Sequence, residues 1–337
     1  MILNIILLII GFVLLIKGAD FLVEGSSLVA KRFGISNVVI GLTVIAFGTS
    51  APELIVNIIS SVKGNSDIGM GNIVGSNISN ILLILGVSAL FSSLKVDKSI
   101  IKKQIPFSIL ASIALFLLIN STIVNGVGPD GLMRSGGLVL ILFFCIFLYY
   151  TFSVVKKEDN FREVLRRLFS FRFFKRVCDN GEILQKGGNL TSVFMIIGGI
   201  VALFFGGKFI VDSSVFIASS LGLSQALIGL TIVAVGTSLP ELAASVVAAR
   251  KNQADMAVGN VIGSNIFNIL WVLGLSAVIS PISYNPAMNF DIIFLIIISL
   301  GLLPLIFMGK KYHFTKKEGL LLITLYIAYL VYIIIRG

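Results

Sequence analysis

The sequence predicts an all-α polytopic membrane protein with ten transmembrane helices in two inverted five-helix repeats. Three observations lead to this fold. The 337-residue chain is 57% hydrophobic and only 12% charged, whereas a soluble domain would carry roughly twice that charged fraction. Two apolar segments reappear in near-identical form 188 positions later. Basic residues are concentrated in every second loop between the apolar runs.

The apolar runs define ten predicted spans, each long enough to cross a hydrocarbon core of about 30 Å as a helix. The first repeat, residues 1–153, contains spans at 2–29, 37–62, 68–93, 101–121 and 130–153. The second repeat, residues 190–337, contains spans at 190–218, 225–249, 256–280, 289–308 and 317–335. The repeats are joined by a basic linker at 154–189. Since the first run lacks a basic start and a cleavage site, we interpret it as a retained span.

The distribution of basic residues predicts the orientation. The loops after the odd-numbered spans hold 21 of the 26 lysines and arginines, whereas 219–224 and 281–288 hold none. The positive-inside rule therefore places the linker in the cytoplasm and both termini outside the cell membrane. Because each repeat has an odd number of spans, the second repeat enters the membrane from the opposite side, which makes the repeat inverted.

The polar residues of the chain exclude several other classes. The net charge of +10 lies in short loops, which argues against nucleic-acid binding. Two cysteines, Cys145 and Cys178, do not form a disulfide framework, and the single His313 excludes a His/Cys zinc site. The linker segment FREVLRRLFSFRFFKRV is basic with interleaved phenylalanines. We interpret it as an amphipathic anchor at the anionic inner leaflet, with a regulatory role as the alternative.

Charged residues also occur in the first span of each repeat. Lys17 precedes Asp20 by three positions, and Lys208 precedes Asp212 by four. Side chains at these spacings are neighbours on a helix surface. We expect each pair to neutralise itself within its own helix.

The main functional signal is a duplicated acidic motif. The chain has GLTVIAFGTSAPE at 41–53 and GLTIVAVGTSLPE at 229–241, so Glu53 and Glu241 both lie inside apolar spans. A carboxylate inside a membrane is costly unless it is paired or hydrated, and it is therefore a functional hypothesis by default. Two such acids related by a repeat predict a cation site built by both halves.

The residues before each glutamate predict a broken helix. Pro52 cannot donate to the preceding turn and its ring clashes there, while Gly48 loosens the same turn. We expect a break near 46–50 that frees backbone carbonyls, with Ala46 and Thr49 the first candidates. Irregular backbone is tolerated inside a membrane only where it is buried in protein or lines a cavity. A cation is a natural partner for such carbonyl oxygens.

Ser50 and Glu53 share one face of the helix that follows the break, and add a hydroxyl and a carboxylate. The alternative is a capping box, since Ser-x-x-Glu fits that motif. A capping box does not explain why Ser238 and Glu241 repeat the arrangement, so we favour the ion site.

A second duplicated motif follows each acidic one. The chain has GNIVGSNISN at 71–80 and GNVIGSNIFN at 259–268. Ser76 and Asn80 lie four residues apart on one helix face, and Ser264 and Asn268 do the same. These hard oxygen donors suit Ca²⁺ or Na⁺; the alternative is packing between helices. For the remaining asparagines of these motifs we expect a structural role: Asn72, Asn77, Asn260 and Asn265.

The number of acids limits the cargo. Two ionised glutamates balance one divalent cation or two monovalent cations. Ca²⁺ and Na⁺ can use the same mixed shell of carboxylate, carbonyl and hydroxyl oxygens, whereas Mg²⁺ gives up its water reluctantly.

At these residues the chain resembles the cation/Ca²⁺ exchanger superfamily, specifically the prokaryotic Na⁺/Ca²⁺ exchangers. The resemblance covers essentially the whole chain. It implies four central helices (spans 2, 3, 7 and 8) around the cation sites, with long spans 1 and 6 sliding against them to alternate access. The ligands that it implies are Glu53, Glu241, Thr49, Thr237, Ser50, Ser238, Ser76, Ser264, Asn80, Asn268 and the carbonyls of Ala46 and Ala234.

The sequence departs from part of that superfamily at one position. Some relatives carry Asp where this chain has Asn268, and in the K⁺-dependent branch that acid is linked to K⁺ use. Here both mirrored positions, Asn80 and Asn268, are Asn. This argues against K⁺ and leaves two carboxylates. The H⁺/Ca²⁺ branch has different residues around its glutamates, so GTS-x-PE favours Na⁺.

The resulting prediction is a secondary antiporter in which Na⁺ entry drives Ca²⁺ out, and not an enzyme. The alternatives are an H⁺/Ca²⁺ antiporter, a cation channel with a carboxylate filter, and an intramembrane hydrolase, which lacks a nucleophile or histidine beside the acids. We expect Ca²⁺, Na⁺ and the lipid bilayer as partners, no prosthetic group, and a functional monomer.

Overall fold

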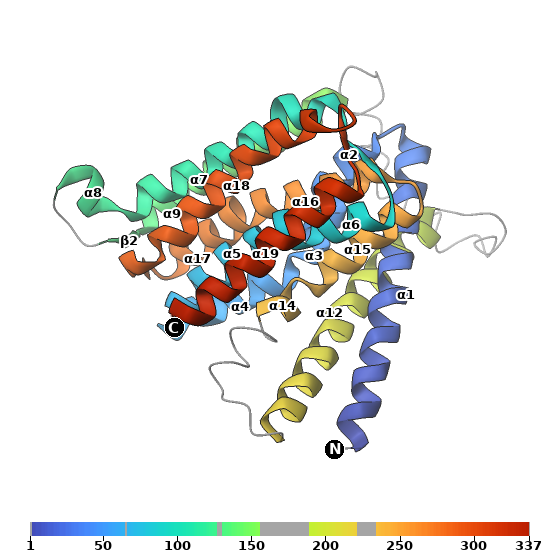
Figure 1. Cartoon of the computed structure of the whole chain (residues 1–337), viewed down its shortest axis with the longest axis horizontal. Coiled ribbons are helices and arrows are strands. Elements are labelled where there is room, and N and C mark those ends of the chain that lie inside the picture. Colours follow the sequence, from blue (N-terminus) through green and yellow to red (C-terminus); the bar gives the residue numbers. More distant parts are fainter. Residues whose placement is uncertain (1, 65, 127–129, 156–188, 221–233, 337) are drawn as a thin grey trace, which may run out of the picture.

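The computed structural model describes residues 2–64, 66–126, 130–155, 189–220 and 234–336, which are mostly helical (Figure 1). Most of the predicted linker, 156–188, and the first part of the predicted seventh span, 225–233, lie outside the described residues. The α-helices are α1 (Ile2–Phe33), α2 (Asn37–Ile40), α3 (Ala46–Thr49), α4 (Ala51–Val62), α5 (Ser66–Ser79), α6 (Leu85–Phe91), α7 (Ile105–Ile119), α8 (Ser121–Asn125), α9 (Arg134–Val155), α12 (Asn189–Ser220), α14 (Ala234–Thr237), α15 (Leu239–Arg250), α16 (Ala254–Ile266), α17 (Gly274–Ile279), α18 (Asn289–Met308) and α19 (Lys316–Arg336).

Within these residues, eight helices are long and apolar enough to cross a membrane. They are Ile2–Phe33, Ile68–Phe91, Ile100–Ile119, Arg134–Phe152, Thr191–Ile217, Ala254–Ile279, Pro286–Met308 and Lys316–Arg336. They correspond to eight of the ten predicted spans. The predicted second span is a pair of helices, Asn37–Thr49 and Ala51–Val62, bent by 47°. Of the predicted seventh span, α14 and α15 are described.

Helix α1 extends to Phe33, four residues beyond the predicted end. Gly34 follows it with φ +65, a left-handed conformation that glycine adopts without strain. The Ile35 amide donates to the Ala30 carbonyl at 3.0 Å, which closes the helix end as in a Schellman motif. The cap, rather than the loss of hydrophobicity, therefore sets the boundary.

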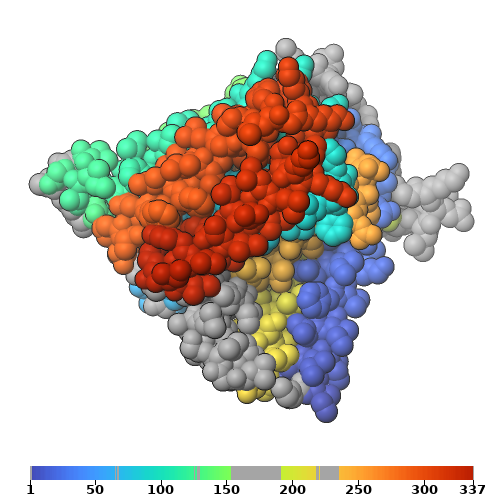
Figure 2. Space-filling model, in the orientation of Figure 1, coloured from blue at the N-terminus to red at the C-terminus, as the bar shows by residue number. Residues whose placement is uncertain are grey.

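The two longest helices, α1 and α12, pack side by side and project together from the other helices (Figures 1 and 2). Gly11, Gly18 and Gly25 face α12 at intervals of seven residues. A Cβ atom added at any of them would lie 2.9 Å from a carbonyl oxygen of α12. The backbones approach each other this closely because the seam lacks side chains, which is how helices associate in membranes.

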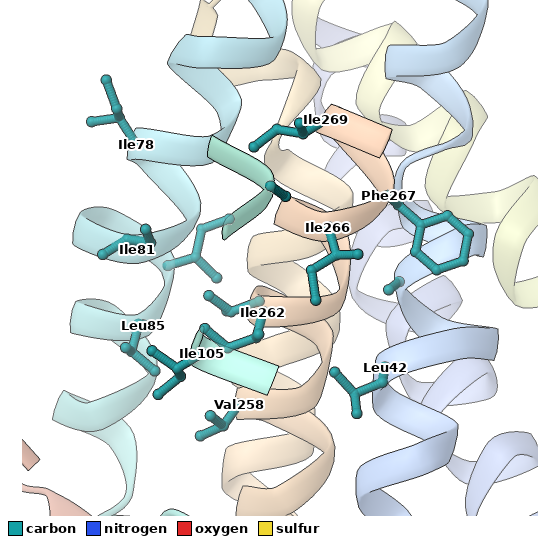
Figure 3. Close-up of a cluster of buried hydrophobic side chains, with 14 of the residues drawn as sticks. Leu42, Ile78, Ile81, Leu85, Ile105, Val258, Ile262, Ile266, Phe267 and Ile269 are labelled. Atoms are coloured by element: carbon teal, nitrogen blue, oxygen red, sulfur yellow. The ribbon is translucent and has the colours of Figure 1, made fainter. Parts of the chain in front are cut away.

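The centre of the molecule contains two segments that are continuous helices except for π-helical turns. The turn η2 (Asn80–Ile84) joins α5 to α6, and η5 (Phe267–Leu273) joins α16 to α17. The two segments lie next to each other, and Ile81, Leu85, Ile262 and Val258 belong to their cluster of buried side chains (Figure 3). Two further π-turns are η1 (Gly41–Ile45) and η3 (Ile100–Gln104); η6 (Pro286–Met288) is a 3₁₀ turn.

Short β-strands connect loops from the two halves of the chain, which the all-α prediction did not include. Strand β1 (Leu94–Lys95) pairs antiparallel with β4 (His313–Phe314), with Leu94 opposite Phe314. Strand β2 (Gly131–Leu132) pairs antiparallel with β3 (Ile282–Ser283), with Gly131 opposite Ser283. In each sheet the backbone N–H and C=O groups of two loops are paired with each other.

The predicted pairing of charges within α1 needs correction. Lys251, just after α15, places its Nζ 3.1 Å from Asp20 Oδ1 and 3.6 Å from Glu24 Oε2. Asp20 therefore pairs between helices rather than with Lys17 of its own helix, because the fold brings the end of α15 against α1. The expected contact between Lys208 and Asp212 is present at 4.0 Å, with both side chains largely exposed.

Candidate functional site

Each acidic motif interrupts its helix at the serine, as the proline and glycine content predicts. Helix α3 ends before Ser50 (φ −83, ψ 7), and α4 resumes with Pro52 in its first turn. Ser238 (φ −88, ψ 5) separates α14 from α15 in the same way, with Pro240 in the first turn. Proline fits there because the first amides of a helix have no partner within the helix.

The carbonyls around the two breaks differ between the halves. The Ser50 amide donates to the Ala46 carbonyl at 3.0 Å, so that carbonyl is not free, contrary to expectation. The Thr49 hydroxyl is a second donor to the same carbonyl, at 3.4 Å. The Ser238 amide, which is equivalent to the Ser50 amide, donates instead to the Val235 carbonyl at 3.2 Å. It does not bond to the carbonyl of Ala234, the residue equivalent to Ala46.

The side chain of Ser50 contacts the other half of the chain. Its Oγ donates to Glu241 Oε1 at 3.1 Å, and it forms no cap on its own helix. The Ser50 amide, which a capping box would direct to Glu53, bonds to Ala46. This contact excludes the capping box as the role of Ser50.

A matching contact links the second half to Glu53. Ser238 Oγ donates to Ser76 Oγ at 3.2 Å, and Ser76 Oγ donates to Glu53 Oε1 at 3.4 Å. Both glutamates are fully enclosed, with 0% and 1% of Glu53 and Glu241 exposed. Each carboxylate thus has one oxygen hydrogen-bonded to a serine in the buried interior.

Four asparagines cross between the central segments in a reciprocal pattern. Asn80 Nδ2 donates to Asn265 Oδ1 at 2.9 Å, and Asn268 Nδ2 donates to Asn77 Oδ1 at 3.0 Å. Asn77 and Asn265 also donate to each other's backbone carbonyls, at 3.3 and 3.4 Å. Asn77 and Asn265 therefore have the structural role expected of them. They also orient Asn80 and Asn268, since these bonds fix which end of each amide is the nitrogen.

Several buried oxygens of the predicted ligands have no hydrogen-bond partner among the described residues. They are Glu53 Oε2, Glu241 Oε2, Asn80 Oδ1, Asn268 Oδ1 and Ser264 Oγ. Buried polar atoms are nearly always partnered, so a set of unpartnered oxygens in one region requires an explanation. The two asparagine oxygens can only accept a hydrogen bond, and the two glutamate oxygens can only accept one when their carboxylates are ionised. This donor set fits a hard cation held by oxygen ligands.

The threonines of the acidic motifs bond mainly to asparagines of the opposite half. Thr49 Oγ1 donates to Asn260 Oδ1 at 3.3 Å and lies 3.4 Å from the Ala46 carbonyl. Thr237 Oγ1 donates to Asn72 Oδ1 at 3.3 Å. Thr49 is fully buried and Thr237 is half-buried. The structure brings both threonines to the breaks, where the sequence placed them.

Two features of this region were not anticipated from the sequence. Asn260 also donates to the Glu241 carbonyl at 3.3 Å and to Ser245 Oγ at 2.9 Å, so it connects three helices. Asn80 and Asn268 both lie in π-helical turns, which often mark functional sites. The asparagine of each repeated Gly-Asn pair, Asn72 and Asn260, was a sequence signal for the bonds of Asn260. No residue pattern specified the π-turns.

The fold and this site define an integral membrane transporter with an oxygen-lined interior. The chain belongs to the sodium/calcium exchanger family, since the family model described as "Sodium/calcium exchanger protein" matches residues 3–153 and 191–335. It is a multi-pass membrane protein of a family of cation/Ca²⁺ antiporters.

Named relatives cover nearly the whole chain. Sodium/calcium exchanger MaX1 of Methanosarcina acetivorans is 34% identical over 350 residues, covering 97% of each chain. Inner membrane protein YrbG of Escherichia coli is 34% identical over 85% of this chain and 83% of its own. A structure of the sodium-calcium exchanger NCX_Mj soaked with Na⁺ and Ca²⁺ superposes with a TM-score of 0.78, at 33% identity and 98% coverage of both chains.

The contact of Ser50 with Glu241 can be tested by double-mutant cycles of thermal unfolding. We expect Ser50→Ala to couple with Glu241→Gln by about 0.5–3 kcal/mol, because the two residues share a hydrogen bond. Coupling of Ser50→Ala with Glu53→Gln should be close to zero. A larger coupling with Glu53→Gln than with Glu241→Gln would show that Ser50 caps its own helix. Ser88→Ala is a matched control, since Ser88 is equally buried and its Oγ has no partner among the described residues.

Proposed function

We propose that the protein exchanges Ca²⁺ for Na⁺ across the membrane by alternating access, with the cations held near the midplane by Glu53 and Glu241. The observation that carries this proposal is the set of unpartnered buried oxygens contributed by both halves of the chain. Each of those atoms belongs to a residue of the duplicated motifs. Ca²⁺ and Na⁺ both accept such mixed oxygen shells.

The proposed ligands have distinct roles. Glu53 and Glu241 supply the charge through the carboxylate oxygens that face away from the serines. Asn80 and Asn268 supply neutral amide oxygens, because their nitrogens are held by the opposite half. Hydroxyl and carbonyl oxygens complete the shell: Ser50, Ser76, Ser238, Ser264, Thr49, Thr237, Ala46 and Ala234. Two carboxylates balance one Ca²⁺ or two Na⁺, so the same site can alternate between them without a large net charge.

We further propose that the two halves, 1–153 and 190–337, are inverted repeats of five spans joined by the linker 154–189. Two mirrored sheets support this. Strand β3 lies 188 residues after β1, and the sheets β1–β4 and β2–β3 flank opposite ends of α18. A 20-residue helix is about 30 Å long, so the sheets lie at opposite faces of one membrane span. In this arrangement both termini are extracellular and the linker is cytoplasmic.

Single-cysteine labelling tests the inverted topology. In a background with Cys145 and Cys178 replaced by Ser, an impermeant maleimide applied to intact cells should label Lys63→Cys but not Arg250→Cys. These exposed positions lie at the C-terminal ends of equivalent helices, α4 and α15, in the two halves. Permeabilised cells, in which both should react, provide the control. Labelling of both positions in intact cells would contradict inversion, and labelling of Arg250→Cys alone would reverse the orientation.

The proposed change of access uses α1 and α12 as one moving body. Their glycine seam makes them a close pair, and they project from the other helices (Figure 2). Gly48, beside the first break, lies so close to α12 that a Cβ atom there would be 2.7 Å from Ile200. Movement of the pair would therefore be transmitted directly to a broken helix of the site.

Two other functions remain as alternatives within this fold. An H⁺/Ca²⁺ antiporter would use the same carboxylates, and a cation channel would conduct without a counter-ion. A site divided between two halves favours alternating access over a static pore. Transport measurements distinguish Na⁺ from H⁺ as the coupling ion.

Transport into proteoliposomes tests the proposed function. Vesicles loaded with Na⁺ should take up ⁴⁵Ca²⁺ when diluted into Na⁺-free buffer, and uptake should stop when the Na⁺ gradient is removed. Glu53→Gln and Glu241→Gln should each lose at least about a hundredfold of this rate, because each removes a charge that offsets Ca²⁺. Asp212→Asn, at an exposed carboxylate of α12, is the matched control and should keep the rate.

Uptake that follows a pH gradient and ignores Na⁺ would replace the proposal with H⁺/Ca²⁺ exchange. Uptake that needs neither gradient would indicate a channel. Full transport by either glutamine variant would contradict the assignment of the glutamates.

A further inference from the structure

Two hydrogen bonds between the halves of the chain are related by the internal repeat. Thr49 donates to Asn260, and Thr237 donates to Asn72, both at 3.3 Å from Oγ1 to Oδ1. Thr237 lies 188 positions after Thr49, and Asn260 lies 188 after Asn72. Each threonine of the GTS motif is therefore held by the first asparagine of the GN motif in the other half.

A hydroxyl group can bind a cation only through a lone pair on its oxygen, so its hydrogen must point elsewhere. The acceptor that takes this hydrogen decides whether the oxygen faces the ion. Groups behind the direct ligands commonly fix ligand orientation in this way, and their loss typically costs about 10–100-fold in metal affinity. An asparagine Oδ1 behind each threonine fulfils this requirement.

The acceptor at Asn260 is itself fixed. Its Nδ2 donates to Ser245 Oγ at 2.9 Å and to the Glu241 carbonyl at 3.3 Å, and its side chain is 1% exposed. These bonds prevent the amide from flipping, so Oδ1 must face Thr49. Thr49 Oγ1 also lies 3.4 Å from the carbonyl oxygen of Ala46, which the proposed function assigns to the cation. With that carbonyl bound to a cation, Asn260 remains to hold the hydroxyl hydrogen.

The equivalent position in the first half is held less firmly. Asn72 is half-buried, and its Nδ2 has no partner among the described residues. The residue that corresponds to Ser245 is Asn57, whose Nδ2 donates to the Glu53 carbonyl at 3.2 Å. The two halves therefore share the bond to threonine but differ in what supports the asparagine.

We propose that Asn260 and Asn72 are positioning residues that turn the hydroxyl oxygens of Thr49 and Thr237 toward the transported cation, each acting from the opposite half of the protein. This inference rests on the proposed function, since it assumes that the threonines are ligands. It gives the GN motifs a role in cation binding in place of the purely structural one expected from the sequence. Because Asn260 is fixed by two further bonds, its loss should weaken binding more than the loss of Asn72.

Calorimetric titration of Ca²⁺ into the purified full-length protein tests this inference through a double-mutant cycle. We expect Asn260→Ala and Thr49→Val each to raise the Kd for Ca²⁺ about tenfold. The double variant should bind about as weakly as either single variant, because Asn260 acts through Thr49. Loss of about a hundredfold in the double variant would show independent effects and overturn the inference.

A second cycle with Asn72→Ala and Thr237→Val covers the case in which Asn260→Ala does not fold. We expect the same pattern with a smaller change in Kd. The Asn72 amide nitrogen makes no hydrogen bond among the described residues, so Asn72 holds its threonine less firmly than Asn260 does. An unchanged Kd in Asn72→Ala and Asn260→Ala would also overturn the inference. Asn289→Ala is the matched control, because it removes an asparagine bond to Asn120, 2.9 Å long, outside the site.

The same titration separates this inference from the proposed function. If Glu53→Gln abolishes Ca²⁺ binding while the asparagine and threonine variants act independently, the site stands and only the positioning role fails. If Glu53→Gln leaves the Kd unchanged, the proposed site fails, and the positioning role fails with it.

Discussion

The structure depends on two carboxylates, from opposite halves of one chain, that are buried within a membrane protein. Glu53 and Glu241 each have one oxygen bonded to a serine and one with no partner among the described residues. An uncompensated buried charge is strongly unfavourable, so the ionised carboxylates need a positive counter-charge. In the function we propose, a transported cation supplies that charge, which would explain why such costly residues are present twice.

The other features of the core hold this pair of acids in place. Each helix breaks at the serine before its glutamate, which directs that hydroxyl toward the opposite half. The crossed asparagines, Asn77 with Asn268 and Asn265 with Asn80, join the two central segments. Asn80 lies one helical turn after Ser76, whose hydroxyl donates to Glu53. Polar contacts between the halves are thus made by side chains from both copies of each motif. The two segments also pack through buried apolar side chains, which include Ile81 and Ile262 (Figure 3).

Much of this arrangement could be predicted from the sequence because a membrane span must be apolar throughout. Against that background the duplicated glutamates, prolines and asparagines were evident, and the break at Ser50 followed from Pro52. Contacts between distant residues could not be predicted in this way. Local spacing paired Ser50 with Glu53 and Asp20 with Lys17, whereas the fold pairs them with Glu241 and Lys251. The π-turns and the two short sheets likewise depend on tertiary packing.

The most direct test of the shared site is crystallography with Sr²⁺, a heavier analogue of Ca²⁺ whose position anomalous scattering can reveal. If the site is shared, an anomalous peak should lie between the two carboxylates and contact Oε2 of both Glu53 and Glu241, at distances slightly longer than the roughly 2.3–2.6 Å typical of Ca²⁺. The peak should disappear in Glu53→Gln at the same Sr²⁺ concentration. A peak that contacts only one glutamate, or that persists unchanged in the variant, would contradict the shared site.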